Sequence, residues 1–432
     1  MTCWQRPMHA PLHNLYFAAS AMLSPVLPLW LELRRLRGKE DTKRSPERYG
    51  IASSNRPHGM LLWIHAASVG EANSVLYFIG ELRKQFADVH ILVTTGTVTS
   101  ARLMQARLPK GVIHQYVPID TPQATHRFMR HWRPDVALWV ESELWPNLIA
   151  SADRWNCLMG IINGRMSEKS FRLWNKLSSL SSVMLKAFDM VFVQSDADAL
   201  RFQKLGAQRV QCFGNMKYDA RPLACNEEEL LQLKQAIGTR PVWLAASTHP
   251  GEEEEIIKVH DILKQTRKDL LTIIVPRHPS RGIDIVQSCG KIRSALRSKK
   301  QPITSQVEFY IGDTLGELGL FYRLCNAVFM GGSLVKHGGQ NPLEPAHLSC
   351  AIVTGPHTYN FKDTYENMER ERACVRITNT NELAAQLSVL LANAAKINQL
   401  RQAAKTYVES KTGATQKLLK ALAPALMIRE KC

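Results

Sequence analysis

The chain has 432 residues, of which 45% are hydrophobic and 22% charged, a composition typical of a folded protein with two or three hydrophobic cores. Lys and Arg number 55 against 38 Asp and Glu, and the formal net charge of +17 favours an anionic partner such as phospholipid, nucleotide or nucleic acid. The cysteines form no C-x-x-C pair and no Cys/His cluster with zinc spacing, which argues against a zinc site and favours reduced thiols over a disulfide framework.

The N-terminal segment is the one stretch that could meet a bilayer. Residues 12–33 are largely apolar and reach the ~20 residues that a membrane span needs. Basic residues follow at Arg34, Arg35, Arg37, Lys39, Lys43, Arg44 and Arg48, and would hold that side in the cytosol. A helix lying on an anionic membrane surface fits the same pattern, and a helix buried in the protein is the less favoured alternative. We expect residues 1–50 to form a membrane anchor with a basic flank.

From residue 60 onward, short runs rich in Val and Ile alternate with helix-like segments, which is typical of parallel βαβ units. The first series predicts strands over residues 60–65, 90–95, 114–119, 135–140, 158–163, 190–194 and 210–214. We expect these strands to form one doubly wound parallel sheet in a domain of residues 51–222.

A second series follows a polar linker at residues 219–229. It predicts strands over residues 242–246, 270–275, 307–311, 327–330 and 351–353. We expect a second α/β domain over residues 223–432, including the C-terminal helices. Two such domains facing each other would form a cleft at the carboxyl ends of their strands, where open α/β sheets bind ligands.

Several common catalytic motifs are absent from the sequence. There is no G-x-G-x-x-G after a strand, no G-x-x-x-x-G-K-[ST], and neither H-E-x-x-H nor an Asp-x-Asp pair suited to a metal. Dehydrogenase, P-loop NTPase and metalloprotease functions are therefore disfavoured.

Glu71 stands at the end of I-H-A-A-S-V-G-E, where the first predicted strand passes through small residues into a helix. Its carboxylate could be a general base, or an acid favoured at a helix N-terminus by the helix dipole. Position alone favours the helix-start interpretation. Because the dipole would also lower the pKa of Glu71, a catalytic role requires an opposing influence such as desolvation.

Two further motifs of the first half carry charged side chains at strand ends. Glu141 opens E-S-E-L-W-P-N after the fourth predicted strand, and could place carboxylates at a ligand site or form a salt-bridged surface loop. Lys217, in G-N-M-K-Y-D, could reach the negative charge of a ligand, although by itself it resembles any exposed lysine.

The second half has three motifs suited to a nucleotide. Pro276 and Arg277, in P-R-H-P, follow a very apolar strand, where a guanidinium could hold phosphate. The segment D-T-L-G-E-L, residues 313–318, could offer backbone N–H groups to an anion or a base edge. In G-G-Q-N-P-L-E-P-A, residues 338–346, a glycine loop leads into a helix whose Glu344 could accept both hydroxyls of a ribose.

These motifs occur in the same order along nearly the whole chain, which resembles the transferases of 3-deoxy-D-manno-octulosonic acid (Kdo) in lipopolysaccharide biosynthesis. The resemblance implies a GT-B fold, with the lipid acceptor on the N-terminal domain and the nucleotide on the C-terminal domain. It also implies a CMP-Kdo donor, a lipid A precursor (lipid IVA) as acceptor, and location at the cytoplasmic face of the inner membrane.

The same resemblance assigns roles to individual residues. Glu71 falls on the catalytic base, and Glu141 and Lys217 fall on positions that support the transition state. The positions around the phosphate, cytosine and ribose of CMP are Pro276, Arg277, Leu315, Gly316, Glu317, Asn341, Pro342, Leu343 and Glu344. Gln340 departs from the small or His residue expected there.

The implied mechanism is direct displacement with inversion through an oxocarbenium-like transition state. Glu71 would take a proton from a primary hydroxyl of the acceptor glucosamine. Arg277 and helix N-terminal amides would stabilise the departing phosphate, so we expect neither a metal nor a cofactor.

Two alternatives remain open at this point. One is a GT-B enzyme acting on a UDP-sugar, or a related epimerase; the other is a basic nucleic-acid-binding protein, which only the net charge favours, because no RNA-binding motif occurs. The motifs do not distinguish members that add one, two or several Kdo units, and they leave the oligomeric state open.

Overall fold

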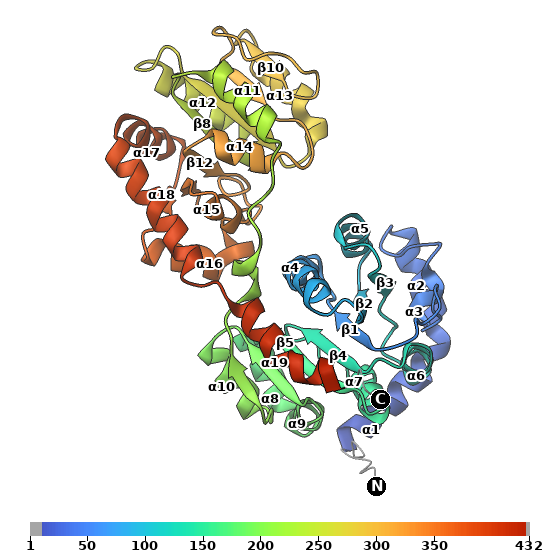
Figure 1. Ribbon diagram of the computed structural model, residues 1–432. Coiled ribbons are helices and arrows are strands. Elements are labelled where there is room, and N and C mark those ends of the chain that lie inside the picture. The colour runs from blue at the N-terminus through green and yellow to red at the C-terminus, as the bar shows by residue number, and fades with distance from the viewer. Residues whose placement is uncertain (1–10, 429–432) are drawn as a thin grey trace. The chain divides into compact units, whose positions relative to one another are not determined.

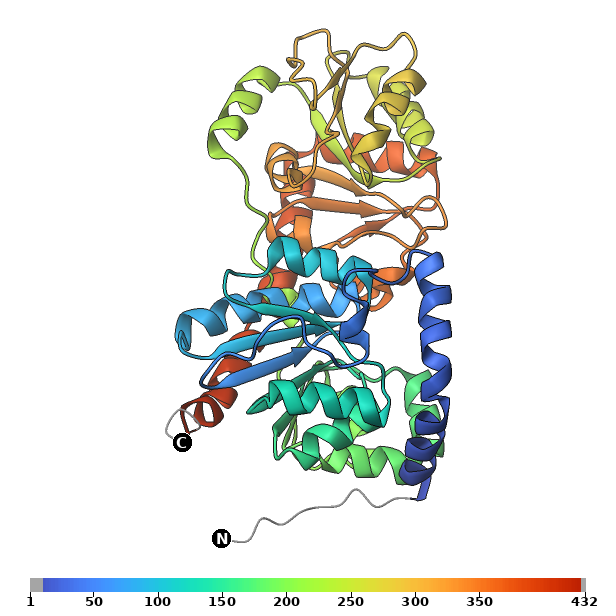
Figure 2. The ribbon, with the colours of Figure 1, turned by 90° about the vertical axis from the view of Figure 1, so that its right-hand side faces the viewer.

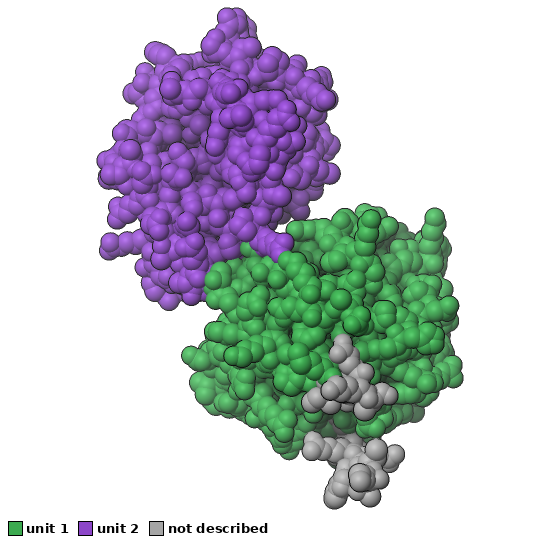
Figure 3. Space-filling view, in the orientation of Figure 1, with its two compact units in different colours: residues 1–220, 412–432 green, residues 221–411 purple. Residues whose placement is uncertain are grey.

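The structure, a computed structural model, describes residues 11–428 (Figure 1). The chain forms two compact units, coloured separately in Figure 3. Unit 1 takes the chain up to Ala220 and again from Thr412, and unit 2 is Arg221–Lys411. Residues 1–10 of the expected anchor and 429–432 of the expected second domain lie outside the described residues.

Unit 1 contains a seven-stranded parallel sheet with the order β3-β2-β1-β4-β5-β6-β7. Alternate residues of β1 point to opposite faces of this sheet: Leu61 and Trp63 pack in one core, and Leu62 and Ile64 in another. Helices cover both faces, which explains why these strands read as continuous apolar runs. The strands are β1 Leu61–His65, β2 His90–Thr95, β3 Ile113–Tyr116, β4 Val136–Val140, β5 Leu158–Gly164, β6 Met190–Val193 and β7 Val210–Cys212.

The helices of unit 1 begin at recognisable sequence signals. Ser68, Thr97, Thr121, Ser167 and Ser195 each accept a hydrogen bond from a first-turn amide as N-caps. The helices that follow the strands are α4 Val69–Gln85, α5 Val98–Arg107, α6 Pro122–Trp132, α7 Pro146–Arg154, α8 Glu168–Lys176, α9 Ser178–Lys186 and α10 Asp196–Lys204, with the 3-10 turn η2 Met216–Asp219 at the end.

The N-terminal segment consists of α1 Pro11–Leu23, η1 Ser24–Val26, α2 Leu27–Leu36 and α3 Ser45–Arg48. Figure 2 shows α1 and α2 running along the side of unit 1, where α1 contacts α6, α7 and α9. Within the described residues, Pro11–Leu36, with 26 residues, is the one helical segment long and apolar enough to cross a membrane.

This segment is more closely integrated into unit 1 than the expected division at residue 50 implies. His13 and Leu31 are buried. In the basic flank, Arg44 pairs with the buried Glu47, and Arg48 is itself buried beside Glu40. The structure therefore groups residues of the expected anchor with the first α/β domain.

The last helix, α19 Ala414–Ile428, also belongs to unit 1, whereas we had expected it in the second domain. Its apolar face, including Leu418, Leu422 and Leu426, joins the core on one face of the sheet beside α4. Asp219 fixes the entry to this helix, because its carboxylate accepts hydrogen bonds from the amides of Gly413 and Thr415, at 2.6 and 2.5 Å.

Unit 2 contains a second seven-stranded parallel sheet with the order β10-β11-β9-β8-β12-β13-β14. Its strands are β8 Val242–Thr248, β9 Leu271–Pro276, β10 Ser294–Leu296, β11 Phe309–Ile311, β12 Ala327–Met330, β13 Ala351–Thr354 and β14 Val375–Arg376. Its helices are α11 Glu227–Ile237, α12 Glu253–Lys264, α13 Gly282–Ser288, α14 Leu318–Leu324, α15 Leu343–His347, α16 Lys362–Arg370, α17 Thr380–Ala392 and α18 Ala394–Glu409, with 3-10 turns η3 Pro279–Arg281 and η4 Tyr359–Phe361.

Each strand that the sequence predicts is present, with some ends shifted, and the expected doubly wound sheets are confirmed. Two edge strands, β10 and β14, were not predicted. They have three and two residues, too few to show a period of their own.

Candidate functional site

Glu71 lies in the first turn of α4, directly after the loop that leaves β1. One carboxylate oxygen accepts a hydrogen bond from Ser68 Oγ at 2.6 Å, and the other accepts from the amide of Ala67 at 2.9 Å. Ser68 in turn caps the helix by accepting from the amide of Glu71 at 3.3 Å. The helix-start role that position suggested is therefore present in the structure.

Glu71 also has the electrostatic environment that a proton-accepting role requires. The residue is only 6% exposed, and burial raises the pKa of its carboxyl to about 7. The hydrogen bond from Ser68 opposes this shift, whereas the charges of Glu143 and Glu141 add to it. A carboxyl with a pKa near neutrality can accept and release a proton at physiological pH.

Glu141, directly after β4, and Lys217, in η2, are brought together. Lys217 Nζ lies 2.8 Å from Glu141 Oε1, and both side chains are partly exposed. Glu141 has a φ of 60°, in the left-handed region that non-glycine residues rarely occupy. Backbone strain of this kind is frequent at functional sites.

Hydrogen bonds within unit 1 hold the backbone around this ion pair. The amide of Glu141 donates to the carbonyl of Ile162 at 3.0 Å. Asn215 caps η2 by accepting from the amide of Lys217 at 2.9 Å, and Asn163 accepts from the amide of Met216 at 2.9 Å. The pair is therefore anchored on both sides.

Glu143 is a second acid of the same loop. Its carboxylate accepts a hydrogen bond from Trp145 Nε1 at 2.8 Å, and burial raises its pKa. We refer to residues 141–145 as the acidic loop. Its two carboxylates act on Glu71 electrostatically, which the sequence alone did not predict.

In unit 2, the sheet order brings the predicted nucleotide motifs to one edge. The neighbouring strands β11, β9, β8 and β12 are parallel, so their carboxyl ends share this edge. The loops that leave it are residues 312–317, 277–281, 249–252 and 331–342, which we call the donor edge.

Glu252 organises the donor edge, and sequence analysis missed it. Its buried carboxylate accepts four backbone hydrogen bonds, from the amides of His249, Gly332, Ser333 and Leu334, at 2.6 to 3.0 Å. A side chain at Gly331 would clash, because a Cβ there would lie 2.4 Å from the carbonyl oxygen of Ser247. The sequence signal that could have indicated this role is the run S-T-H-P-G-E-E, residues 247–253, which directly follows the predicted strand 242–246.

Imidazoles and guanidinium groups gather at the same edge. The rings of His249 and His337 stack at 3.6 Å, and Gln340 Nε2 lies 2.9 Å from His249 Nε2. Burial, together with the charges of the neighbouring His337, His278, Arg277 and Arg281, lowers the pKa of His249 to about 4. This positive potential suits an anionic ligand.

Pro276 and Arg277 lie at the carboxyl end of an apolar strand, as the sequence predicts. Pro276 is the last residue of β9, and the amide of Arg277 donates to the carbonyl of Thr248 at 3.0 Å. The Arg277 side chain is exposed. It is therefore accessible to an anion from solution.

The segment Leu315–Glu317 begins with an exposed turn and ends with a residue held by an ion pair. Leu315 is 81% exposed and Gly316 has a φ of 82°. Glu317 forms an ion pair with Arg297 at 2.6 Å and accepts a hydrogen bond from Thr314. Its carboxylate therefore orders the loop.

The segment Asn341, Pro342, Leu343 and Glu344 forms the start of α15. Asn341 accepts a hydrogen bond from the amide of Leu343 at 3.1 Å and donates to Glu344 Oε1 at 3.4 Å. Glu344 is the second residue of this five-residue helix. It thus lies close to the glycine loop.

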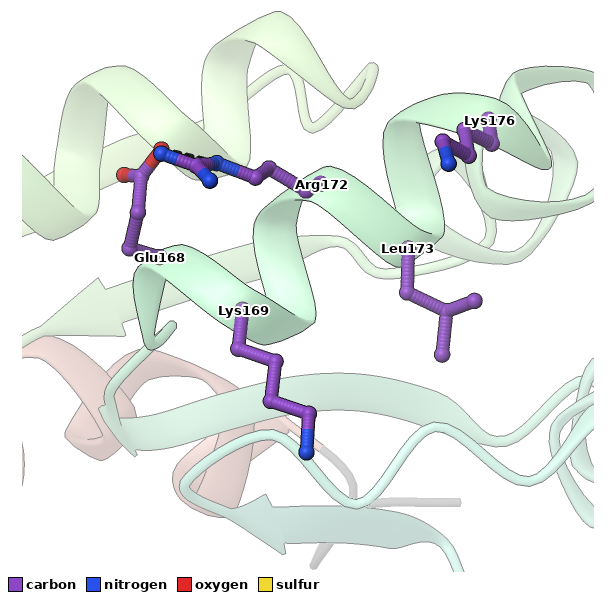
Figure 4. Close-up of a pocket in the computed structure, with 5 residues that line it drawn as sticks. All are labelled: Glu168, Lys169, Arg172, Leu173 and Lys176. Atoms are coloured by element: carbon purple, nitrogen blue, oxygen red, sulfur yellow. Dashed lines mark hydrogen bonds and ion pairs between the residues drawn. The ribbon is translucent and has the colours of Figure 1, made fainter.

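A surface hollow of about 480 Å³ lies elsewhere, on α8 (Figure 4). Its lining residues are Glu168, Lys169, Arg172, Leu173 and Lys176. All come from one helix, and none is a predicted site residue. Within residues 11–428, no group of three or more His, Cys, Asp or Glu is arranged to hold a metal ion.

Comparison with known proteins identifies the family and supports the fold. Residues 43–220 match the family model for 3-deoxy-D-manno-octulosonic-acid transferase (kdotransferase). A 3-deoxy-D-manno-octulosonic acid transferase of Rickettsia bellii is 37% identical over 88% of this chain and 90% of its own length. One of Haemophilus influenzae is 32% identical over 95% and 98%. A solved glycosyltransferase structure from Rickettsia africae has a TM-score of 0.54 and 12% identity, over 86% of this chain and 99% of its own.

The two doubly wound sheets and the structural likeness define the GT-B fold. The chain belongs to the Kdo transferase family of lipopolysaccharide biosynthesis. The resemblance stated from the motifs is thereby confirmed.

Proposed function

We propose that the protein transfers Kdo from CMP-Kdo to the lipid A precursor lipid IVA, with inversion at the anomeric carbon. Membership of the family supports the transferred sugar. The observation that carries the mechanism is the buried Glu71, whose pKa of about 7 suits a general base.

In the proposed reaction, the Glu71 carboxylate takes the proton of a primary hydroxyl on the acceptor glucosamine. The hydroxyl oxygen forms a bond to the anomeric carbon of Kdo as the bond from that carbon to the phosphate oxygen breaks. The electron pair leaves with CMP, and the proton remains on Glu71 until it passes to water. Attack opposite the leaving group inverts the anomeric centre.

Lys217 and Glu141 support this step as a pair. The ammonium group, 2.8 Å from Glu141 Oε1, places a positive charge in the neighbourhood of the acidic loop. We propose that it attracts the negative charge of the substrates, while Glu141 holds it in place. Glu141 and Glu143 also keep the pKa of Glu71 raised.

The donor edge of unit 2 would hold CMP. The exposed Arg277 would contact the phosphate, assisted by the positive potential around His249. Leu315 and Gly316 would lie near the cytosine, with Glu317 holding their loop. Asn341 and Glu344 would face the ribose, and Pro342 and Leu343 would shape the turn between them.

We propose that the reaction needs no metal ion and no cofactor. CMP leaves with one phosphate group, so less negative charge develops than on a diphosphate. A guanidinium group with backbone amides is sufficient to stabilise such a charge.

The N-terminal segment would keep the enzyme at the cytoplasmic face of the inner membrane. Its exposed apolar side chains include Leu15, Met22, Leu23, Val26, Leu29, Trp30, Leu33 and Leu36. Exposed basic residues follow at Arg35, Arg37, Lys39 and Lys43. This combination suits insertion beside anionic headgroups.

The test is product analysis with purified enzyme, CMP-Kdo and lipid IVA. We expect the acceptor mass to increase by whole Kdo units, and CMP to inhibit where UDP does not. Transfer from a UDP-sugar, or inhibition by UDP alone, would contradict the proposed donor. A filter-binding assay with RNA at physiological salt tests the alternative that the protein binds nucleic acid.

A further inference from the structure

Asp120 connects the N-terminal segment to the start of α7. It follows β3 and immediately precedes Thr121, the N-cap of α6. Its Oδ1 accepts a hydrogen bond from the amide of Leu148 at 2.8 Å. Its Oδ2 accepts one from the amide of Asn147 at 3.2 Å and one from the hydroxyl of Tyr16, on α1, at 2.9 Å.

Helix α7 depends on this carboxylate for its N-terminal cap. The residue before the helix is Trp145, which makes no side-chain cap hydrogen bond, and the first residue is Pro146, which has no N–H. The next amides need acceptors, because the first turn of a helix has none of its own. A carboxylate at the positive end of the helix dipole forms a charge-assisted cap.

A second connection runs parallel to the first. Asn147 Nδ2 donates to the backbone carbonyl of Asp120 at 2.7 Å and to Ser20 Oγ at 2.8 Å. Tyr16 and Ser20 are one helical turn apart on α1. One face of α1 is therefore connected to the start of α7 twice, directly through Ser20 and by way of Asp120 through Tyr16.

The start of α7 also fixes the acidic loop. Trp145, which adjoins Pro146, donates its Nε1–H to Glu143 at 2.8 Å. Its ring lies 5.3 Å from the ring of His65 in an edge-to-face arrangement. His65 ends β1 and leads into the loop that carries Ser68 and Glu71. A movement of the start of α7 would thus reach Glu143 and, through His65, the loop that leads to Glu71.

We propose that Asp120 is a positioning residue through which the docked helix α1 sets the acidic loop, and with it the proton affinity of Glu71. The proposal rests on the proposed function in one respect, namely that Glu71 is the base. Asp120 itself touches neither Glu71 nor the reacting atoms in this scheme; it acts through α7.

Two variants test the connection in the full-length protein. Tyr16→Phe removes one hydroxyl, and Asp120→Asn keeps the size of the side chain but removes its charge. Ser24→Ala is the matched control, because Ser24 Oγ bonds to Gln123 at 3.0 Å and so links the same N-terminal segment to α6, without touching α7. Each protein is compared with the parent and with Glu71→Gln.

The first measurement is hydrogen exchange of the peptide covering residues 141–150. We expect faster exchange, by about tenfold for Asp120→Asn and less for Tyr16→Phe, because the capped amides open more often. Ser24→Ala should match the parent. Unchanged exchange in Asp120→Asn would overturn the proposal, whatever the base proves to be.

The second measurement is the pH profile of the Kdo transfer rate. A looser acidic loop lets water reach Glu71 and moves its negative neighbours, so the pKa of Glu71 falls and the acid limb moves to lower pH. We expect a shift of about half a pH unit or more, with CMP affinity unchanged within about twofold. A purely structural role would scale the whole profile without moving its midpoint, and that result would overturn the proposal.

Failure of the proposed base gives a different pattern. If Glu71→Gln transfers Kdo as fast as the parent, the base assignment fails, and the exchange measurement alone decides the role of Asp120. If Glu71→Gln is impaired while Asp120→Asn and Tyr16→Phe behave like Ser24→Ala, the base stands and the positioning role is lost.

Discussion

Glu71 in unit 1 and Glu252 in unit 2 show how similar positions yield different chemistry. Each acid follows a buried parallel strand and stands at the start of a helix, and each is buried. Glu252 accepts four backbone N–H groups. Glu71 accepts one N–H group and one hydroxyl, and two further carboxylates act on it.

The difference lies in how far each carboxylate is satisfied. Burial raises the pKa of both groups, and at Glu252 four amides oppose that rise. A carboxylate so fully engaged by backbone amides serves to hold a loop together. Glu71 keeps fewer partners, and its like-charged neighbours favour protonation, which suits a group that must exchange a proton.

The largest expected effect is a loss of the Kdo transfer rate when Glu71 is replaced. Glu71→Gln keeps the size of the side chain but removes the base, so Kdo transfer should fall by about 10² to 10⁴. CMP affinity should be nearly unchanged, because the proposed nucleotide site is on unit 2. Transfer assays beside calorimetric titration with CMP measure both in one variant.

Glu81→Gln is the control for that substitution, since Glu81 lies on the same helix, is partly buried and pairs with Lys84. It should retain the parental rate. If Glu71→Gln is as active as the parent, Glu71 is only a helix-start acid and the base must be sought at Glu141 or Glu143. If rate and CMP affinity fall together, folding has been disturbed.

The pH dependence of stability sharpens the contrast further. Because the folded-state pKa of Glu71 is raised from 4.5 to about 7, its contribution to stability is complete below pH 4.5 and is lost as pH rises through 7. Glu71→Gln should therefore be more stable than the parent above pH 7, by up to about 3 kcal/mol. The transfer rate of the parent should change in the opposite direction, rising with pH to a plateau above 7.

Urea unfolding of both proteins at pH 5 and pH 8 measures this difference. Other titrating groups, such as Asp120, occur in both proteins and largely cancel in the comparison. A stability difference that does not vary between these pH values would contradict the raised pKa of Glu71.

Glu252→Gln should show the opposite division of effects. An amide side chain offers one acceptor oxygen, and its NH₂ group would face backbone N–H groups, at a cost of about 1–3 kcal/mol in stability. We expect CMP to bind about tenfold more weakly, because the donor edge loosens, while transfer at saturating CMP-Kdo stays within about tenfold of the parent. The exposed Glu254→Gln serves as control in thermal unfolding and CMP titration. Parental CMP affinity in Glu252→Gln would show that this loop does not bear on the donor.

The sequence predicted most of the strands because they are apolar runs, and in unit 1 N-cap residues such as Ser68 and Thr97 mark where the following helices begin. It did not predict where α19 packs. An apolar helical face indicates burial without indicating which core receives it, and only Asp219 and the face beside α4 decide this.

The site was predicted unevenly for a related reason. The residue pattern alone favours a helix-start role for Glu71, because the desolvation that raises its pKa depends on the folded surroundings. The resemblance gave Glu141 and Lys217 their roles, but their ion pair joins positions far apart in the chain and was not predicted. Glu252 and Asp120 were missed because their partners are backbone amides from distant segments, which leave no residue-type pattern.

The smallest expected effect concerns metal removal. The buried acids at and directly after the donor edge already have partners: Glu252 accepts from four amides, and one oxygen of Glu253 accepts from Thr248 at 2.9 Å and pairs with Arg281 at 2.8 Å. The groups that would face the phosphate, Arg277 and the nearby imidazoles, carry positive charge or donate hydrogen bonds, which suits an anion better than a cation. EDTA should therefore leave the rate of Kdo transfer unchanged within about twofold, and added Mg²⁺ should not raise it. The assay is run in detergent, so that vesicle aggregation plays no part. Loss of transfer in EDTA, with recovery on adding Mg²⁺, would show that a cation assists the departure of CMP. The comparison between Glu71 and Glu252 would then apply to proton transfer alone.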